Sequence, residues 1–210
     1  MGSTAPARSP ATLVRADRAD LCLEFANTRF WRGRDPVTET LHGPIELLDW
    51  CLANGAVDAA AARALRARWK QRPAQAQAVF DAAIGLRETL FPLFAAVAGG
   101  AGPAPDDLAM LNRALAAAPS RKHLRRTAEG YGWQVDLLPR AAPELLAAVL
   151  WSAGDLVAGT RRDRVRQCAN PQCQWLFLDD SKSGTRRWCA MSACGNRAKA
   201  HRHYLRKKAG

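Results

Sequence analysis

Four cysteines in the last fifth of the chain have the spacing of a metal site. Cys168, Cys173, Cys189 and Cys194 form two close pairs, each C-x4-C, separated by fifteen residues. Each close pair can fold into a tight turn that directs two sulfur atoms at one point, and the intervening loop brings the second pair back to complete a tetrahedron. The pattern therefore predicts a zinc ion held by four thiolates. With no open coordination position, its role would be structural.

Two other kinds of chemistry also use four cysteines. Two disulfides would need an oxidising compartment, and an iron–sulfur cluster also takes four thiolates. The chain shows no basic stretch followed by an apolar run at its start, so we expect no signal peptide. Its most apolar stretch, residues 90–98, is far shorter than the ~20 residues of a membrane span. We therefore expect a cytoplasmic protein without a membrane partner, whose reduced cysteines bind zinc.

Positive charge is concentrated in the same part of the chain. The chain has 31 Lys and Arg and 19 Asp and Glu, and residues 161–210 hold 13 and 3 of these. That segment therefore carries +10 of the net charge of +12, which points to a polyanionic partner. The alternative is a solvated basic tail, which is less favoured because the segment also carries aromatic residues and regularly spaced cysteines.

The residues around the cysteines predict a small treble-clef-like module. Gln174–Leu178 and Thr185–Trp188 are expected to form a β-hairpin, with Asp179–Gly184 as its turn. A helix is expected to follow Cys194 and to end near Lys208. A module of about 40 residues has too little core to fold alone, so metal binding would supply folding energy.

The expected helix and hairpin would present cations to a nucleic acid. Such a helix can follow the phosphate backbone, and arginine can also read guanine edges in the major groove. DNA is the partner that we favour; RNA stays open as an alternative, as does a scaffold role in which the module only docks on another protein. The predicted nucleic-acid contacts are Arg186, Arg187, Arg197, Lys199, Arg202, His203, Arg206 and Lys207.

Cys194-Gly195-Asn196-Arg197 spells CGNR. Together with CANPQCQWLFLD and GTRRWCAMSACGNRAKAHRHY, this segment resembles the CGNR zinc finger of bacteria from about Cys168 to Lys208. Upstream, LCLEFANT and ELLDWCLANG are similar to the ABATE domain that usually precedes this finger. The family is regarded as one of stress-induced transcriptional regulators. The resemblance implies zinc bound by the four cysteines, DNA bound by the finger and a ligand sensed by the ABATE domain.

The rest of the chain predicts a mainly α-helical domain with one small β-hairpin, an α+β fold class. We expect residues 1–18 to be disordered, 19–160 to form the helical ABATE-like sensor domain and 161–210 to form the zinc-finger domain. Apolar periodicity predicts a short helix within residues 20–29. Prolines and an aspartate at helix starts predict five more, beginning near residues 44, 58, 73, 105 and 143.

Two details of this domain can be tested directly. Pro92 is expected to bend or break the long third of these five helices. A change from helical to alternating periodicity predicts a hairpin made of His123–Thr127 and Tyr131–Leu137.

Four residues near the ABATE-like motifs are candidates for a small-molecule effector site: Asn27, Thr28, Arg29 and Trp50. The alternative is that Asn27 and Thr28 satisfy backbone groups at the end of an element and that Trp50 belongs to the core. The sequence leaves open whether the protein forms a homodimer. The sequence contains no recognisable nucleophile–base set, phosphate loop or open metal site, so we expect that the protein is not an enzyme.

Overall fold

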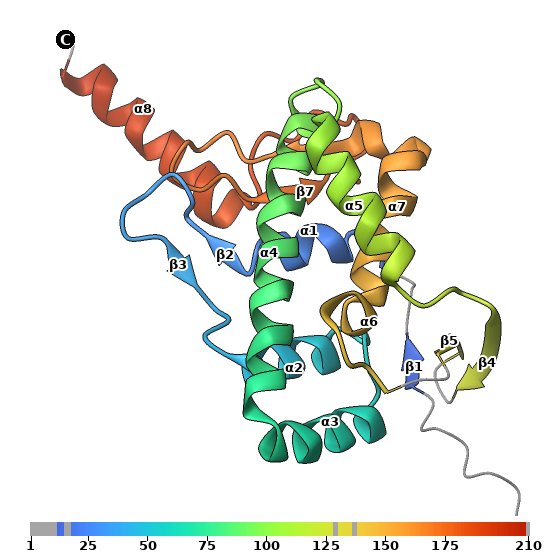
Figure 1. Cartoon of the computed structure of the whole chain (residues 1–210). Helices are drawn as coiled ribbons and strands as arrows, with labels where there is room; N and C mark the ends of the chain where they lie inside the picture. The colour runs from blue at the N-terminus through green and yellow to red at the C-terminus, as the bar shows by residue number, and fades with distance from the viewer. Residues whose placement is uncertain (1–11, 15–17, 128–129, 136–137, 209–210) are drawn as a thin grey trace, which may run out of the picture.

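Most of the chain is helical, because apolar residues recur at helical spacing between the prolines and glycines that start and stop each helix (Figure 1). The computed structural model describes residues 12–14, 18–127, 130–135 and 138–208, without the side chains of residues 201–203 and 205. Within these residues, three small antiparallel sheets accompany the helices. The predicted fold class is confirmed: a mainly helical part with a small hairpin precedes a module with four clustered cysteines.

The helices begin where the sequence predicts. Asp58 caps the second of them, since its Oδ1 accepts a hydrogen bond from the N–H of Ala61 at 2.8 Å. The last one is divided at Leu146 into two helices. The bounds are α2 Pro44–Ala53, α3 Ala59–Gln71, α4 Pro73–Ala98, α5 Pro105–Ala117, α6 Ala142–Leu145 and α7 Ala147–Ala158.

Helix α4 continues for six residues beyond Pro92, so the expected break does not occur. Leu90, Leu93 and Phe94 flank the proline and are almost completely buried. Their packing in the core outweighs the one backbone hydrogen bond that proline cannot donate.

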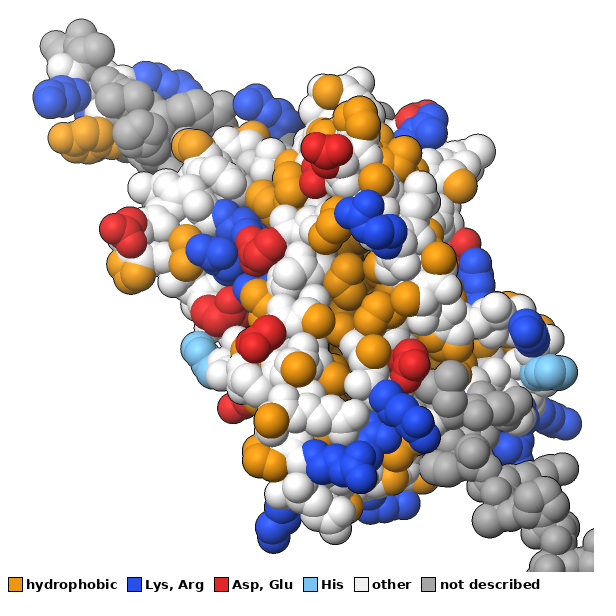
Figure 2. All heavy atoms as spheres, viewed as in Figure 1, with side chains coloured by type: hydrophobic (Ala, Val, Ile, Leu, Met, Phe, Trp, Pro, Cys, Tyr) orange, Lys and Arg blue, Asp and Glu red, His pale blue; other side chains and the backbone are white. Residues whose placement is uncertain are grey.

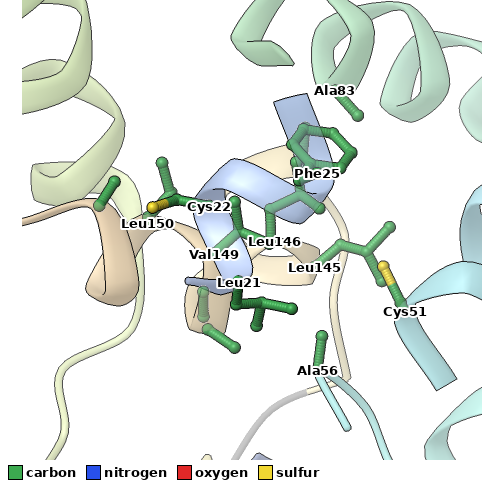
Figure 3. Packing of buried hydrophobic residues seen from close by; sticks show 14 of the residues in the cluster. Leu21, Cys22, Phe25, Cys51, Ala56, Ala83, Leu145, Leu146, Val149 and Leu150 are labelled. Atoms are coloured by element: carbon green, nitrogen blue, oxygen red, sulfur yellow. The ribbon is translucent and has the colours of Figure 1, made fainter. Parts of the chain in front are cut away.

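Helix α1 (Leu21–Ala26) lies at the centre of the helical part. Five of its six residues are apolar and buried, so it needs partners around its whole circumference. Figure 3 shows these partners, which come from α2, α4, α6 and α7. The hydroxyl of Ser152 in α7 accepts from the N–H of Cys22 at 3.1 Å and donates to the carbonyl of Ala19 at 3.2 Å. A side chain from another helix therefore satisfies the start of α1.

The predicted hairpin is confirmed up to Val135 and belongs to a three-stranded sheet; residues 136–137 of its second predicted strand lie outside the described residues. Strand β4 (His123–Thr127) pairs with β5 (Gly130–Val135), which also pairs with β1 (Thr12–Val14). Strand β1 lies within residues 1–18, which we expected to be disordered; residues 1–11 and 15–17 lie outside the described residues. Asp58 holds β1, because its Oδ2 accepts from the N–H of Leu13 at 2.9 Å. A strand of three residues is too short to show an alternating pattern.

The strand pairing of the cysteine module differs from the prediction. Strand β7 (Leu176–Leu178) lies in the first predicted strand, but its partner is β6 (Val165–Gln167), which precedes the first cysteine. Residues 185–188 form no strand. The buried carboxylate of Asp179 holds this segment in a loop instead, by accepting hydrogen bonds from the N–H of Ser181 at 3.0 Å and of Arg186 at 2.8 Å.

Two further features concern the position of this module. Val165, Leu176 and Leu178 belong to the same hydrophobic core as α1 and α4, so the β6–β7 hairpin is packed into the helical part. Helix α8 (Asn196–Lys208) instead projects away from the body of the molecule (Figure 1).

Among the described residues, no helix is long and apolar enough to span a membrane. Strands β2 (Arg29–Phe30) and β3 (Thr38–Glu39) form a short hairpin between α1 and α2.

Candidate metal centre and nucleic-acid interface

The first cysteine pair lies in the turn of the β6–β7 hairpin. The backbone N–H groups of Cys173 and Gln174 donate to the carbonyl of Asn170 at 2.9 and 3.2 Å, which closes the turn. The N–H of Cys168 donates to the carbonyl of Trp175 at 2.8 Å. These bonds bring the two sulfur atoms within 4.8 Å of each other.

The second pair lies where the loop after β7 meets α8. Cys194 occupies a π-helical turn, Met191–Gly195, that leads directly into α8. The N–H of Gly195 donates to the carbonyl of Ala190 at 3.1 Å and folds this turn back toward Cys189. The start of α8 is therefore fixed by the same turn that positions a cysteine.

The four sulfur atoms have the separations of a tetrahedral zinc site. The Sγ of Cys189 lies 3.7 Å from that of Cys173 and 3.8 Å from that of Cys194, and all four Sγ atoms lie within 4.8 Å of one another. Zinc–sulfur bonds of about 2.3 Å in a tetrahedron place the sulfurs about 3.8 Å apart. A disulfide needs about 2.05 Å, so these cysteines are not paired in disulfides.

Electrostatics give a reason for a cation at this point. The hydrogen bond from the Cys173 thiol to Cys168, together with burial, raises the pKa of Cys173. Burial and the neighbouring Cys168 thiolate raise the pKa of Cys189 to about 12. Four thiolates can therefore share this site only when a positive ion balances their charge, and zinc binding deprotonates such thiols.

Aromatic side chains surround the sulfur cluster. Phe177 packs among the cysteines, with Trp175 and Trp188 partly buried beside them. Trp31 also packs here, although it lies in the loop between β2 and β3, far away in the sequence. The side-chain amide of Asn170 lies 3.6 Å from the Sγ of Cys194 as a hydrogen-bond donor, which would orient that ligand.

The loop that carries Trp31 contacts the cysteine turn directly. The N–H of Gly33 donates to the carbonyl of Gln172 at 3.3 Å. A Cβ atom on Gly33 would lie 1.8 Å from the carbonyl oxygen of Pro171, so the approach is possible only for glycine. Sequence analysis missed this loop; its signal is a large aromatic residue in a loop that also contains Gly33 and Pro36.

The predicted nucleic-acid residues whose side chains are described are all exposed. The guanidinium of Arg186 lies 4.5 Å from the ring centroid of Phe177, and its Nε donates to the carbonyl of Trp188 at 2.9 Å. The guanidinium of Arg197 lies 4.8 Å from the ring centroid of Trp31. The exposed residues are Arg186, Arg187, Arg197, Lys199, Arg206 and Lys207, whereas the side chains of Arg202 and His203 lie outside the described residues.

The four candidate effector residues have partners within the protein. Asn27 is buried and hydrogen-bonded to the backbone of Leu176. The hydroxyl of Thr28 donates to the carbonyl of Phe25 at 2.8 Å, and the guanidinium of Arg29 lies 3.4 Å from the carboxylate of Glu88. Trp50 packs against the ring of Phe25 with 5.1 Å between ring centroids. Their role in effector binding stays a prediction.

A buried cation was missed by the sequence analysis. Arg87 of α4 is 1% exposed and donates to both carboxylate oxygens of Glu39, at 2.7 and 2.6 Å. Glu88 beside it binds Arg32, with the closest pair of atoms 2.7 Å apart. This network fixes both ends of the loop that carries Trp31. In the sequence, the sign of this buried cation is the position of Arg87. It lies four residues after Ala83 and three before Leu90, on the apolar stripe of the helix.

Comparison with known families places both parts of the chain. Residues 19–160 match the ABATE family, described as a putative stress-induced transcription regulator. Residues 164–207 match the CGNR zinc finger. Neither description is that of an enzyme, and no curated protein matches the chain. With a zinc-finger match over four cysteines of this geometry, the metal is a structural zinc ion.

Proposed function

Because the chain belongs to the ABATE family and ends in a CGNR zinc finger, we propose that it is a DNA-binding transcription regulator. In this proposal the zinc ion shapes the finger, and α8 presents cations to DNA phosphates. The charge of α8 carries the proposal: the helix contains six Lys and Arg residues and no Asp or Glu. Figure 2 displays Lys and Arg side chains along this projecting helix.

The dimensions of α8 suit a DNA groove. Its 13 residues form a rod about 20 Å long, and the major groove of B-DNA, about 12 Å wide, admits an α-helix. Lys199 and Arg206 lie seven positions apart, so they share one face of the helix. Both are exposed, and Lys207 lies beside them. A helix fixed at one end by a zinc ligand and projecting from the body of the molecule can therefore lie against a duplex.

In the same proposal the ABATE part senses a small-molecule effector. Asn27, Thr28, Arg29 and Trp50 are the candidate contacts, although each now has a partner within the protein. The direct contacts of α1 and the β2–β3 loop with the zinc module support a route by which an effector would change the finger. A thermal-shift screen of metabolites would identify such an effector, which should also change DNA affinity.

DNA binding is tested by selecting sites from random duplexes and measuring affinity against salt concentration. The triple variant Lys199→Glu, Arg206→Glu and Lys207→Glu should weaken binding by at least about tenfold and flatten the salt dependence. The matched control changes three exposed cations at and just after α3: Arg63→Glu, Lys70→Glu and Arg72→Glu. It has the same net charge but should bind far better than the α8 variant.

Three results would count against the proposal. Steep salt dependence without a preferred sequence would reduce it to non-specific binding. Absence of binding even at low salt would remove it. Preferential competition by RNA over duplex DNA would favour the alternative nucleic acid instead.

A further inference from the structure

A pocket of about 550 Å³ lies on the zinc module, beside the metal centre. Three segments that the sulfur cluster holds together form its walls: the turn of the first cysteine pair, the residues before Cys189 and the start of α8. The volume lies within the range of about 300–1,000 Å³ that is typical of small-ligand sites. Lys199, Arg206 and Lys207, on which the proposed DNA contact depends, do not line this pocket.

The charge of the lining favours an anion. Arg187 and Arg197 both line the pocket, and no lining residue is acidic. In the described part of the chain, neither guanidinium forms an ion pair with a carboxylate; they lie 5.6 and 4.8 Å from the ring centroids of Trp188 and Trp31. Two guanidinium groups without an acidic partner are suited to a phosphate, which each can bind with two hydrogen bonds.

The remaining lining residues suit a planar group with polar edges. Trp188 supplies an aromatic wall and is only partly buried. Gln172 brings a side-chain amide, which can both donate and accept hydrogen bonds. The amide of Asn170 also lines the pocket, but it already contacts Cys194 Sγ and the N–H of Gln172. Stacking on an aromatic side chain combined with amide contacts is a common way to bind an unpaired base.

The pocket is also held in shape from outside the zinc module. Trp31 lies under the guanidinium of Arg197 at 4.8 Å, and the N–H of Gly33 binds the carbonyl of Gln172. Asn170 donates toward the Sγ of Cys194. A site whose walls are fixed before a ligand arrives loses less entropy on binding.

We propose that this pocket binds one nucleotide unit, with its phosphate between Arg187 and Arg197 and its base against Trp188. The unit has two possible sources, an unpaired nucleotide of a bound strand and a free mononucleotide. The first source rests on the proposed function; the second does not. A base stacked and paired within a duplex cannot enter, so the site would favour strand ends or distorted positions.

The test uses the zinc-loaded full chain labelled with ¹⁵N and follows its NMR spectrum. The probes are adenosine 5′-monophosphate, adenosine, inorganic phosphate and a short oligonucleotide of unpaired thymidines. The monophosphate should shift the backbone amide signals of residues 169, 170, 172, 187 and 197, and adenosine and phosphate should each bind at least about tenfold more weakly. Arg187→Gln should weaken monophosphate binding by at least about tenfold. Lys182→Gln, which removes the same charge from an exposed site outside the pocket, should not.

The outcomes separate this proposal from DNA binding. If neither the monophosphate nor the oligonucleotide shifts the signals of residues 169, 170 and 172 while duplex DNA still binds, the pocket proposal fails and the proposed function stands. If the monophosphate binds in the pocket but no nucleic acid binds the protein, the pocket proposal stands and the proposed function fails. Equal affinity for adenosine and its monophosphate would overturn the role of the two arginines. Zinc content measured in every variant shows that the module is folded.

Discussion

The side-chain amide of Asn27 makes two hydrogen bonds with the backbone of Leu176, a residue 149 positions away. It donates to the carbonyl at 2.8 Å and accepts from the N–H at 3.0 Å. Asn27 is 3% exposed, so the amide completes the hydrogen bonding of β7 where water cannot. The end of α1 and the zinc module are therefore joined by a specific polar contact as well as by apolar packing.

Asn27→Leu should lower the free energy of unfolding by about 2–4 kcal/mol, because it leaves one buried donor and one buried acceptor of Leu176 without partners. Urea denaturation followed by circular dichroism measures this change. Asn54→Leu is the control: the Asn54 amide donates to the carbonyl of Trp50 at the partly exposed end of α2, and its loss should cost less than about 1 kcal/mol. Equal costs for the two variants would contradict a linking role for Asn27.

Gly33→Ala should loosen the loop that carries Trp31, because the new Cβ would lie 1.8 Å from a backbone oxygen of Pro171. The loop must then move away, which exposes Trp31 and weakens the packing around the sulfur cluster. We expect zinc to transfer to a chromogenic chelator several-fold faster than from the unchanged protein. Gly102→Ala, where no atom lies within 4 Å of the new Cβ, should release zinc at the original rate. Unchanged release from Gly33→Ala would show that the loop does not support the metal site.

The features that the sequence predicts well are local ones. The cysteine spacing fixes two turns whose sulfurs meet, and prolines or Asp58 mark the helix starts within one residue. Both signals are carried by residues that are neighbours along the chain. For this reason the zinc ligands and the helical fold class could be predicted without coordinates.

The features that the sequence does not predict depend on distant partners. Strand β7 was expected to pair with residues 185–188, yet it pairs with three residues before Cys168 whose pattern is too short to recognise. From the sequence, Asn27 is a polar residue that could contact a ligand. Only its hydrogen bonds to the backbone of Leu176 show that it completes the edge of a strand. Arg87 is buried because Glu39 lies opposite, which periodicity alone does not indicate.

The unchanged protein should bind one zinc ion per chain, and Cys173→Ser should abolish this binding. Residues 185–208 should then lose protection from hydrogen exchange, because the metal supplies most of their folding energy. The β6–β7 hairpin should retain protection, since Val165, Leu176 and Leu178 belong to the main core. Elemental analysis and hydrogen exchange measured by mass spectrometry test both parts.

The matched control is Cys51→Ser, a change of the same kind at a buried cysteine of α2 outside the sulfur cluster. This variant should be less stable but should still bind one zinc ion. Simultaneous loss of protection in α1 and α4 of Cys173→Ser would show that the helical part and the zinc module unfold as one unit.

The pair of Arg87 and Glu39 should make stability depend on acid. Burial alone would raise the pKa of Glu39, but the hydrogen bonds and charge of Arg87 outweigh it and lower that pKa below its usual value. For Glu88, burial is likewise outweighed, here by Arg32 and Arg87. A carboxylate with a lowered pKa stabilises the fold at pH values above its unfolded pKa of about 4.3, and this contribution is lost as the pH falls through the folded pKa.

Glu39→Gln should lower the free energy of unfolding by about 2 kcal/mol at pH 7, because the buried guanidinium of Arg87 loses one of its two carboxylate partners and keeps only Glu88. Between about pH 5 and pH 3, the stability of this variant should fall less than that of the unchanged protein. Both proteins lose zinc in acid, so the difference between their two curves isolates the effect of Glu39. Two curves that stay parallel from pH 7 to pH 3 would mean that Glu39 has the same pKa in the folded and unfolded chains, and the lowered pKa would be refuted.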